Sequence, residues 1–258
     1  MHQSQPPQIK QALLLKLGKR LKQIESMITS DYDHIWDCCC DHGYLGMSIL
    51  NQQLSAKVHF VDIVPELMID LENKLTVYAK NVSNADSNTW KTHCIDIKTL
   101  PLESYSGKQL IIIAGVGGTQ ASEFVSALCD KYPHLEIDFL LCPVRKLYEL
   151  RQQLISLKLE LKSEILVEEN KQFYELILIS KPVTTTKTTA TNGDEQTKTI
   201  STTGEQLWHC HNALELKQAQ SYLNKNLQHY KKMHQGVNNP EIGDILKAYQ
   251  KVEIQLIE

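Results

Sequence analysis

Residues 35–46 read I-W-D-C-C-C-D-H-G-Y-L-G. The first two end an apolar, strand-like run, Asp37 lies at its tip, and a turn leads into a second apolar segment at 44–50. A carboxylate, a tight turn and a helix start together predict a site for a nucleoside-type cofactor at the carboxyl end of a strand. Cys39 stands where the first glycine of such a turn is usual.

The composition is that of an ordinary soluble protein, with room for one sizeable core and a smaller appendage. The 258 residues are 42% hydrophobic and 22% charged, with a formal net charge of −3. This acidic balance argues against a protein that coats nucleic acid non-specifically, although a local basic face is compatible with it. The first residues lack the pattern of a signal peptide, and no apolar run approaches membrane-spanning length, so we expect a cytoplasmic protein without membrane contact.

The cysteines indicate neither disulfides nor a metal site. Residues 38–40 are consecutive cysteines, a spacing that suits neither purpose. Cys94, Cys129 and Cys142 stand alone in apolar contexts and are expected to be small buried side chains. The run His-Cys-His at 209–211 has no partner cluster nearby and is interpreted as a local polar turn.

Strand-like and helix-like segments alternate along the first two thirds of the chain, which predicts an α/β fold with a mostly parallel sheet. A β-hairpin is expected at 159–168 and 173–180. A parallel sheet with a terminal antiparallel hairpin is typical of class I S-adenosylmethionine methyltransferases, whereas few nicotinamide-binding domains end in this way. The expected strands are 34–38, 57–62, 92–95, 109–114 and 138–142, and the expected helices are 9–28, 44–53, 66–81, 119–131 and 146–157.

The last third of the chain has a different composition. Threonine dominates from 184 onward with almost no apolar residues, so we expect a flexible linker at 183–205 between a main domain, 1–182, and an appendage, 206–258. Helical patterns at 214–230 and 241–257 predict a small antiparallel helical hairpin.

Three further carboxylates accompany Asp37. Asp41 is expected at the helix entry, where it can cap the helix and also face the amino acid end of a cofactor. Asp62 ends the second strand about twenty residues beyond the first turn, the spacing of an acid that accepts hydrogen bonds from ribose hydroxyls. Asp96 follows the third strand, where class I methyltransferases often place an acid near the adenine amino group.

The segment I-I-I-A-G-V-G-G, residues 111–118, is a strand that breaks into glycines. A plain turn rarely needs three glycines, which allow close approach of the backbone to a ligand. In class I methyltransferases the end of this strand borders the transferring methyl group, where such a cluster would leave room for a planar base. The chain contains no phosphate-binding G-x-x-x-x-G-K-[ST] loop, no H-E-x-x-H and no G-x-S-x-G, so phosphoryl transfer, metalloprotease and serine hydrolase functions have no support.

Taken in order, these blocks resemble the bacterial tRNA (adenine-22-N1)-methyltransferase family, a class I S-adenosylmethionine-dependent group. The matching pieces are L-G-K-R-L in the first helix, D-x-x-x-D-H-x-Y-L at 37–45, I-A-G-V-G-G at 113–118, L-L-C-P-V with Pro143, and the hairpin block at 166–177. The resemblance covers roughly residues 13–182, and the helical tail matches the family's appendage in kind.

The chain departs from the family pattern at three places. Cys39 replaces a usual glycine, Gly43 replaces a usual alanine, and Cys142-Pro143-Val144 replaces a usual Gln-Pro-Asn. The last departure removes polar groups that could hold a substrate base.

The resemblance implies that adenine N1 in tRNA attacks the methyl group of S-adenosylmethionine in line, without a metal. Asp41 would stabilise the developing positive charge, Tyr44 would stack on the base, and the backbone at Gly115 and Gly117 would position it. The implied cofactor-binding residues are Asp37, Cys39, Asp41, His42, Gly43, Asp62, Ile63, Asp96, Ile97, Ala114 and Gly115. The expected tRNA-phosphate contacts are Lys16, Lys19 and Arg20 on the basic face of the first helix, Arg145, Lys146 and Arg151, and Lys217, Lys225, Lys231 and Lys232 in the tail.

Two alternatives stay open at the level of sequence. The altered Cys-Pro-Val strand end is compatible with a methyltransferase for another RNA site or a small molecule. Cys39 in the turn is compatible with a catalytically silent module that binds RNA or the cofactor.

Overall fold

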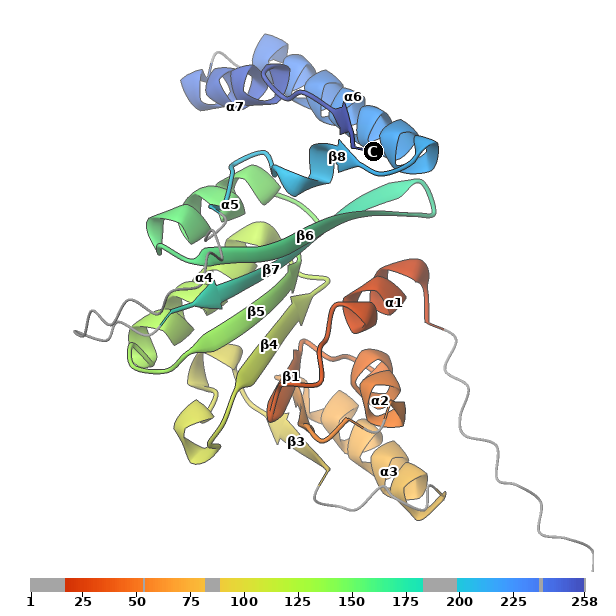
Figure 1. Ribbon diagram of the computed structural model, residues 1–258. Helices are drawn as coiled ribbons and strands as arrows, with labels where there is room; N and C mark the ends of the chain where they lie inside the picture. Colours follow the sequence, from red (N-terminus) through yellow and green to blue (C-terminus); the bar gives the residue numbers. More distant parts are fainter. Residues whose placement is uncertain (1–16, 53, 82–88, 183–198, 237–238, 258) are drawn as a thin grey trace, which may run out of the picture.

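The computed structural model describes residues 17–52, 54–81, 89–182, 199–236 and 239–257. Its main feature is a seven-stranded sheet (Figure 1). The strands are β1 His34–Cys38, β2 Lys57–Asp62, β3 Trp90–Cys94, β4 Gln109–Ala114, β5 Ile137–Cys142, β6 Glu160–Glu169 and β7 Gln172–Lys181. Their spatial order is β3-β2-β1-β4-β5-β7-β6.

The first five strands are parallel, and β7 pairs antiparallel with both β5 and β6. The predicted α/β sheet with a terminal hairpin is therefore confirmed. Strands β1, β4 and β5 are apolar runs because both of their faces are covered, as in other parallel sheets with helices on either side. The parallel pairing of β1 with β2 and with β4 brings the carboxyl ends of these three strands to one edge of the sheet, because neighbouring parallel strands end together.

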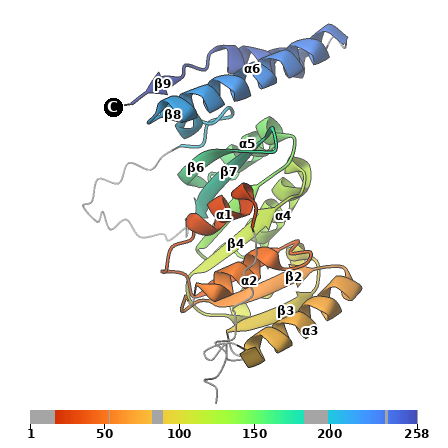
Figure 2. The same ribbon diagram turned by 90° about the vertical axis from the view of Figure 1, so that its right-hand side faces the viewer.

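Helices cover both faces of the sheet (Figure 2). Apolar side chains of α1, α2 and α3 pack with one face, and those of α4 and α5 pack with the other. These helices are α1 Lys19–Ser26, α2 Tyr44–Asn51, α3 Pro65–Asn81, α4 Gly118–Lys131 and α5 Leu147–Ser156. The part of the first predicted helix at 9–16 lies outside the described residues.

The carboxyl-terminal part forms a separate helical layer beyond β6 (Figure 1). Helices α6 Ala213–Gly236 and α7 Pro240–Gln250 pack together, as predicted. The second predicted helix was too long, because the chain leaves the helix after Gln250 and β9 Gln255–Leu256 pairs in parallel with β8 His209–Cys210. The predicted polar turn at 209–211 is also wrong, since Cys210 is buried in an apolar cluster with Trp208 and Tyr222.

A buried ion cluster joins this appendage to the sheet. The Arg151 guanidinium is fully buried and lies 2.6 Å from both Glu164 Oε2 and Glu175 Oε2. Glu175 also accepts a hydrogen bond from the Tyr222 hydroxyl of α6 at 2.6 Å. The prediction that Arg151 contacts RNA phosphate is therefore wrong, because its charge is already neutralised inside the protein.

The predicted linker differs from the structure at its carboxyl end. Residues 183–198 lie outside the described residues, but 199–205 pack against the main domain. Ile200 is buried in the core, and Arg151 donates a hydrogen bond to the Ser201 carbonyl at 3.1 Å. The segment is ordered here because it brings an apolar side chain to the sheet and satisfies a buried donor.

Two other observations complete the fold. Cys142 is buried as predicted, whereas Cys129 is only partly buried and Cys94, at the end of the edge strand β3, is exposed. In the described ranges, no helix combines the length and apolar character that a membrane crossing requires.

Candidate functional site at the carboxyl edge of the sheet

The turn after β1 has an unusual backbone. Cys39, Asp41 and Gly43 have φ angles of 55°, 50° and 71°, in the left-handed region that favours glycine. A Cβ atom at Gly43 would lie 2.5 Å from Leu71 Cδ1, so a larger residue there would require the Leu71 side chain to move. Cys39 therefore occupies a left-handed position, at a cost of about 1 kcal/mol for a residue with a side chain.

Asp37 binds the amino end of α2. Its side chain is 4% exposed, and Oδ2 accepts a hydrogen bond from the Gly46 backbone N–H at 2.9 Å. Burial raises the pKa of Asp37 to about 7, against the lowering effect of that hydrogen bond. The prediction that Asp41 caps this helix is wrong, because the N-cap residue is Gly43 and Asp37 supplies the carboxylate instead.

Gly46 is a site residue that the sequence analysis missed. A Cβ atom at this position would lie 2.3 Å from Phe60 Cε1 on β2. Glycine here lets α2 pack closely on the sheet, which is the role of the third glycine in dinucleotide-binding turns. The spacing G-x-x-G at 43–46 was the available signal.

Asp62 lies at the end of β2 and faces the same turn. Its Oδ2 accepts the Asp41 backbone N–H and its Oδ1 accepts the Val64 backbone N–H, each at 3.2 Å. The next side chain, Ile63, is 67% exposed. A fixed carboxylate beside an exposed apolar side chain offers acceptors for hydroxyls and a surface for a flat ring.

Asp96 follows β3 at the same edge, since Asp62 pairs with Cys94 in the sheet register. Its Oδ1 accepts the Lys98 N–H at 2.8 Å and so caps a short 3₁₀ helix, Ile97–Thr99, while the residue stays exposed. The Ile97 side chain is buried in the core, so its predicted contact with a cofactor is restricted to backbone atoms.

The Cys39 side chain lies among these carboxylates. It is half-buried, and burial together with the charges of Asp62, Asp37 and Asp96 raises its pKa to about 11. The thiol is therefore protonated at neutral pH and is neither a thiolate nucleophile nor a ready metal ligand.

The glycine loop after β4 borders this turn, because β4 is the direct neighbour of β1. Gly115 has a φ angle of 84°, and the nearest atom to a Cβ built on it is Arg20 Nη1 at 4.0 Å. Gly118 is close-packed instead, with the Lys146 carbonyl oxygen 2.3 Å from such a Cβ. The loop is thus open at Gly115 and anchored at Gly118. Val144, beside it after β5, is exposed.

The candidate catalytic side chains Asp41 and Tyr44 lie at the rim, with the predicted cofactor-binding residue His42 between them in the chain. Asp41 and His42 are both exposed, with Asp41 Oδ1 3.7 Å from His42 Nε2. Tyr44 is 49% exposed, and its ring centroid is 5.8 Å from that of His42. The structure therefore places an exposed carboxylate, imidazole and phenol together beside the turn.

The predicted phosphate contacts fall in three places. Lys19 and Arg20 are on α1, while Arg145 and Lys146 follow β5. Lys225 donates to Gln172 at the tip of the hairpin, whereas Lys231 and Lys232 are exposed near the end of α6. Lys16 lies outside the described residues.

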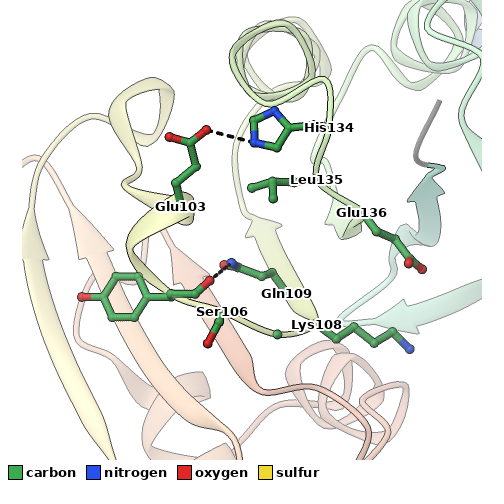
Figure 3. A pocket seen from close by; sticks show the side chains of 9 residues that line it. Glu103, Ser106, Lys108, Gln109, His134, Leu135 and Glu136 are labelled. Carbon is green, nitrogen blue, oxygen red and sulfur yellow. Dashed lines mark hydrogen bonds and ion pairs between the residues drawn. The ribbon is translucent and has the colours of Figure 1, made fainter. Parts of the chain in front are cut away.

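A pocket of about 480 Å³ lies away from this edge (Figure 3). Its lining includes Lys108 and Gln109 at the start of β4 and Glu136 just before β5. The Glu103 carboxylate and His134 Nε2, 3.0 Å apart, close one side of it. Because these are the amino ends of the strands, the pocket is not part of the candidate site. Among the described side chains, no group of three or more histidines, cysteines or acids is arranged to hold a metal ion.

The family model described as "Methyltransferase domain" matches residues 17–177, which is more than half of the chain. The chain belongs to this methyltransferase family. The match spans β1 to β7, so the methyltransferase domain contains the whole candidate site. No curated protein sequence matches the chain.

Solved structures with the same fold include several methyltransferases. TrmK of M. capricolum, in complex with S-adenosyl-homocysteine, is 19% identical with a TM-score of 0.65, over 91% of this chain and 96% of that one. The tRNA (m1A22) methyltransferase TrmK of B. subtilis is 19% identical with a TM-score of 0.59, over 92% and 95%. A Streptococcus pneumoniae protein in complex with S-adenosyl-L-methionine is 14% identical with a TM-score of 0.61, over 91% and 98%. They confirm the predicted class I methyltransferase fold.

Proposed function

We propose that this methyltransferase uses S-adenosylmethionine to methylate N1 of an adenine in tRNA. The observation that carries the proposal is the meeting of Asp37, Asp62 and Asp96 at one edge of the sheet, beside the open glycine loop. The relatives from M. capricolum and S. pneumoniae bind the cofactor or its product, and the B. subtilis relative acts on tRNA. They share this fold, which supports the same cofactor and substrate class here.

The residues present fit S-adenosylmethionine in charge and shape. The cofactor carries a sulfonium and an ammonium group, and three carboxylates face the edge where it would lie. Asp62 is held by two backbone N–H groups in a position to accept from the ribose hydroxyls, and Ile63 offers an exposed apolar surface for the adenine ring. Asp37 is buried next to the turn, where it would face the ammonium group.

S-adenosylmethionine, when bound, supplies an electrophilic methyl group. The chain itself provides orientation, which is the main catalytic contribution expected for a methyl transfer between two bound reactants. The open backbone at Gly115 leaves room for a planar base, and Tyr44 would stack on it. Asp41 would stabilise the positive charge that adenine acquires on methylation at N1.

Substrate contacts would come from the basic side chains around the site. Arg20, Arg145 and Lys146 lie near the glycine loop, and Lys231 and Lys232 extend the basic surface onto the appendage. We infer three parts of the chain: the methyltransferase domain, 1–182, the linking segment and the helical appendage that begins near 206. The protein would act in the cytoplasm on folded tRNA, from which the target base must be unstacked at a cost of roughly a few kcal/mol.

Methylation of bulk tRNA with labelled S-adenosylmethionine, followed by nucleoside analysis, tests the proposal. The expected product is 1-methyladenosine, and Asp41→Asn should lower the rate without a matching loss of cofactor affinity. Glu66→Gln, an exposed carboxylate on α3, is the matched control. A different methylated nucleoside would assign another RNA site, and cofactor binding without any methylated product would indicate a silent module.

A further inference from the structure

The chain contains only three arginines, Arg20, Arg145 and Arg151. Arg151 is fully buried between two glutamates. The other two belong to different elements, α1 and the loop after β5, yet both lie against the glycine loop that follows β4. All other cationic side chains of the chain, apart from histidine, are lysines. The two arginines without a carboxylate partner thus both lie at the glycine loop.

Arg20 is held in place by contacts that leave its charge unpaired. Its guanidinium carbon lies 4.9 Å from the centroid of the Tyr174 ring on β7. Burial raises the pKa of the Cys142 thiol to about 11, and the positive charge of the nearby Arg20 guanidinium partly offsets this effect. Within the described part of the chain, no carboxylate oxygen lies within 4.0 Å of the Arg20 guanidinium.

Arg145 approaches the same loop from the other end. Its Nε atom lies 3.1 Å from a Cβ atom built on Gly117, and its carbonyl oxygen accepts the Gly118 N–H at 2.9 Å. It is exposed, and no ion pair in the described residues involves it. Arg20 beside Gly115 and Arg145 beside Gly117 therefore flank the loop.

We propose that Arg20 and Arg145 bind the backbone phosphates on either side of the nucleotide whose base enters the glycine loop. Guanidinium groups without a carboxylate partner present planar sets of N–H donors that match phosphate oxygens. The aromatic contact of Arg20 orients its guanidinium in advance, which lowers the entropy lost on binding. This assignment rests on the proposed function, because it concerns the substrate of the same site.

The position of the two arginines relative to the strands favours phosphate over other anions as their binding partner. Their neighbours are on β4, β5 and β7, whereas the carboxylates assigned to the cofactor follow β1, β2 and β3 on the other side of β4. The carboxylate of the cofactor is therefore the less suitable partner. The adenine base is also an unsuitable partner for the two guanidinium groups. Methylation at N1 makes adenine cationic, and a guanidinium group at its edge would oppose that charge.

Binding of bulk tRNA across a range of salt concentrations tests the proposal. Arg20→Gln and Arg145→Gln are compared with the wild type and with Lys74→Gln, which removes an exposed cation from α3. Each arginine variant should weaken binding about fivefold and reduce the slope of log K against log salt by about 1, the value for one lost phosphate contact. Lys74→Gln should change neither quantity. Calorimetric titration with S-adenosylmethionine is carried out on every variant.

The outcomes separate this proposal from the proposed function. If the wild type binds tRNA and the arginine variants keep its salt slope, the phosphate assignment is overturned while the function stands. Weaker binding of S-adenosylmethionine by Arg20→Gln, with unchanged tRNA binding, would assign the guanidinium to the cofactor carboxylate instead. If the wild type does not bind tRNA at all, the tRNA function fails and the phosphate assignment fails with it.

Discussion

Replacing the buried carboxylate Asp37 by asparagine should stabilise the protein at alkaline pH and much less at acid pH. Burial raises the pKa of Asp37 from 3.8 to about 7, so the folded state binds this proton more tightly than the unfolded chain does. Below pH 3.8 the carboxyl is protonated in both states and carries no penalty. As pH rises from 3.8 to 7 the unfolded chain ionises first, and stability is lost until the penalty is complete above pH 7.

The magnitude follows from the same two pKa values. Each pH unit between them corresponds to about 1.4 kcal/mol, so the full penalty is about 4 kcal/mol at pH 8. About two of these units lie between pH 5 and pH 7. The gain in the free energy of unfolding of Asp37→Asn over the wild type should therefore be about 3 kcal/mol larger at pH 8 than at pH 5. The unpaired amide N–H group of asparagine adds a cost of about 1–3 kcal/mol, which is the same at both pH values and cancels.

Urea denaturation of both proteins at pH 5 and pH 8 measures this difference. The oxygen of the new amide can still accept from the Gly46 N–H, so the helix contact is retained. Asp70→Asn, at an exposed position on α3, is the control and should show no pH-dependent difference. A gain for Asp37→Asn that is equal at the two pH values would refute the reasoning, because it would mean that the carboxyl titrates alike in the folded and unfolded states.

Three further substitutions test other parts of the site and its support. Cys39→Gly removes a half-buried side chain from a left-handed position among the cofactor carboxylates and should tighten S-adenosylmethionine binding about fivefold in a titration; an unchanged Kd would place the thiol outside the pocket. Gly46→Ala brings a Cβ to 2.3 Å from Phe60 Cε1 and should cost about 2 kcal/mol in urea denaturation, so a loss near zero would contradict the close packing. Glu175→Gln breaks the buried ion cluster and should cost about 3 kcal/mol and speed hydrogen exchange in α6, whereas Glu168→Gln, on the exposed side of the hairpin, should do neither.

The strands of the site could be predicted because the sequence shows both the apolar run of each strand and the residue type that ends it. In β1, β2 and β4 an apolar run ends at an acid or at a glycine, and the predicted bounds agree with the structure. The carboxylates Asp37 and Asp62 could be placed for the same reason, since the end of a parallel strand has a defined position in the sheet.

Contacts between distant elements could not be predicted in this way. Arg151 looked like a free cation on a helix, because its two glutamate partners lie on β6 and β7. The two-residue pairing of β8 with β9 joins segments that are far apart in the chain and leaves no periodic pattern. Gly46 was missed because the G-x-x-G spacing is a weak signal by itself, and the need for glycine becomes evident only when Phe60 is placed against the helix.

The backbone of the turn also required the structure. Aspartate is a residue type that is typical of helix caps. At Asp41, however, the left-handed φ of 50° turns the N–H group toward Asp62 and leaves the carboxylate exposed at the rim. The residue type alone does not distinguish these two arrangements, because aspartate accepts both.

Calorimetric titration of the wild type, Asp62→Asn and Asp70→Asn with S-adenosylmethionine tests the central claim most directly. We expect the wild type and Asp70→Asn to bind with equal affinity and Asp62→Asn to bind at least about tenfold more weakly, because one of the two carboxylate oxygens available to the ribose is lost. Absence of binding by the wild type, or equal binding by all three proteins, would contradict the assignment of this edge of the sheet to the cofactor.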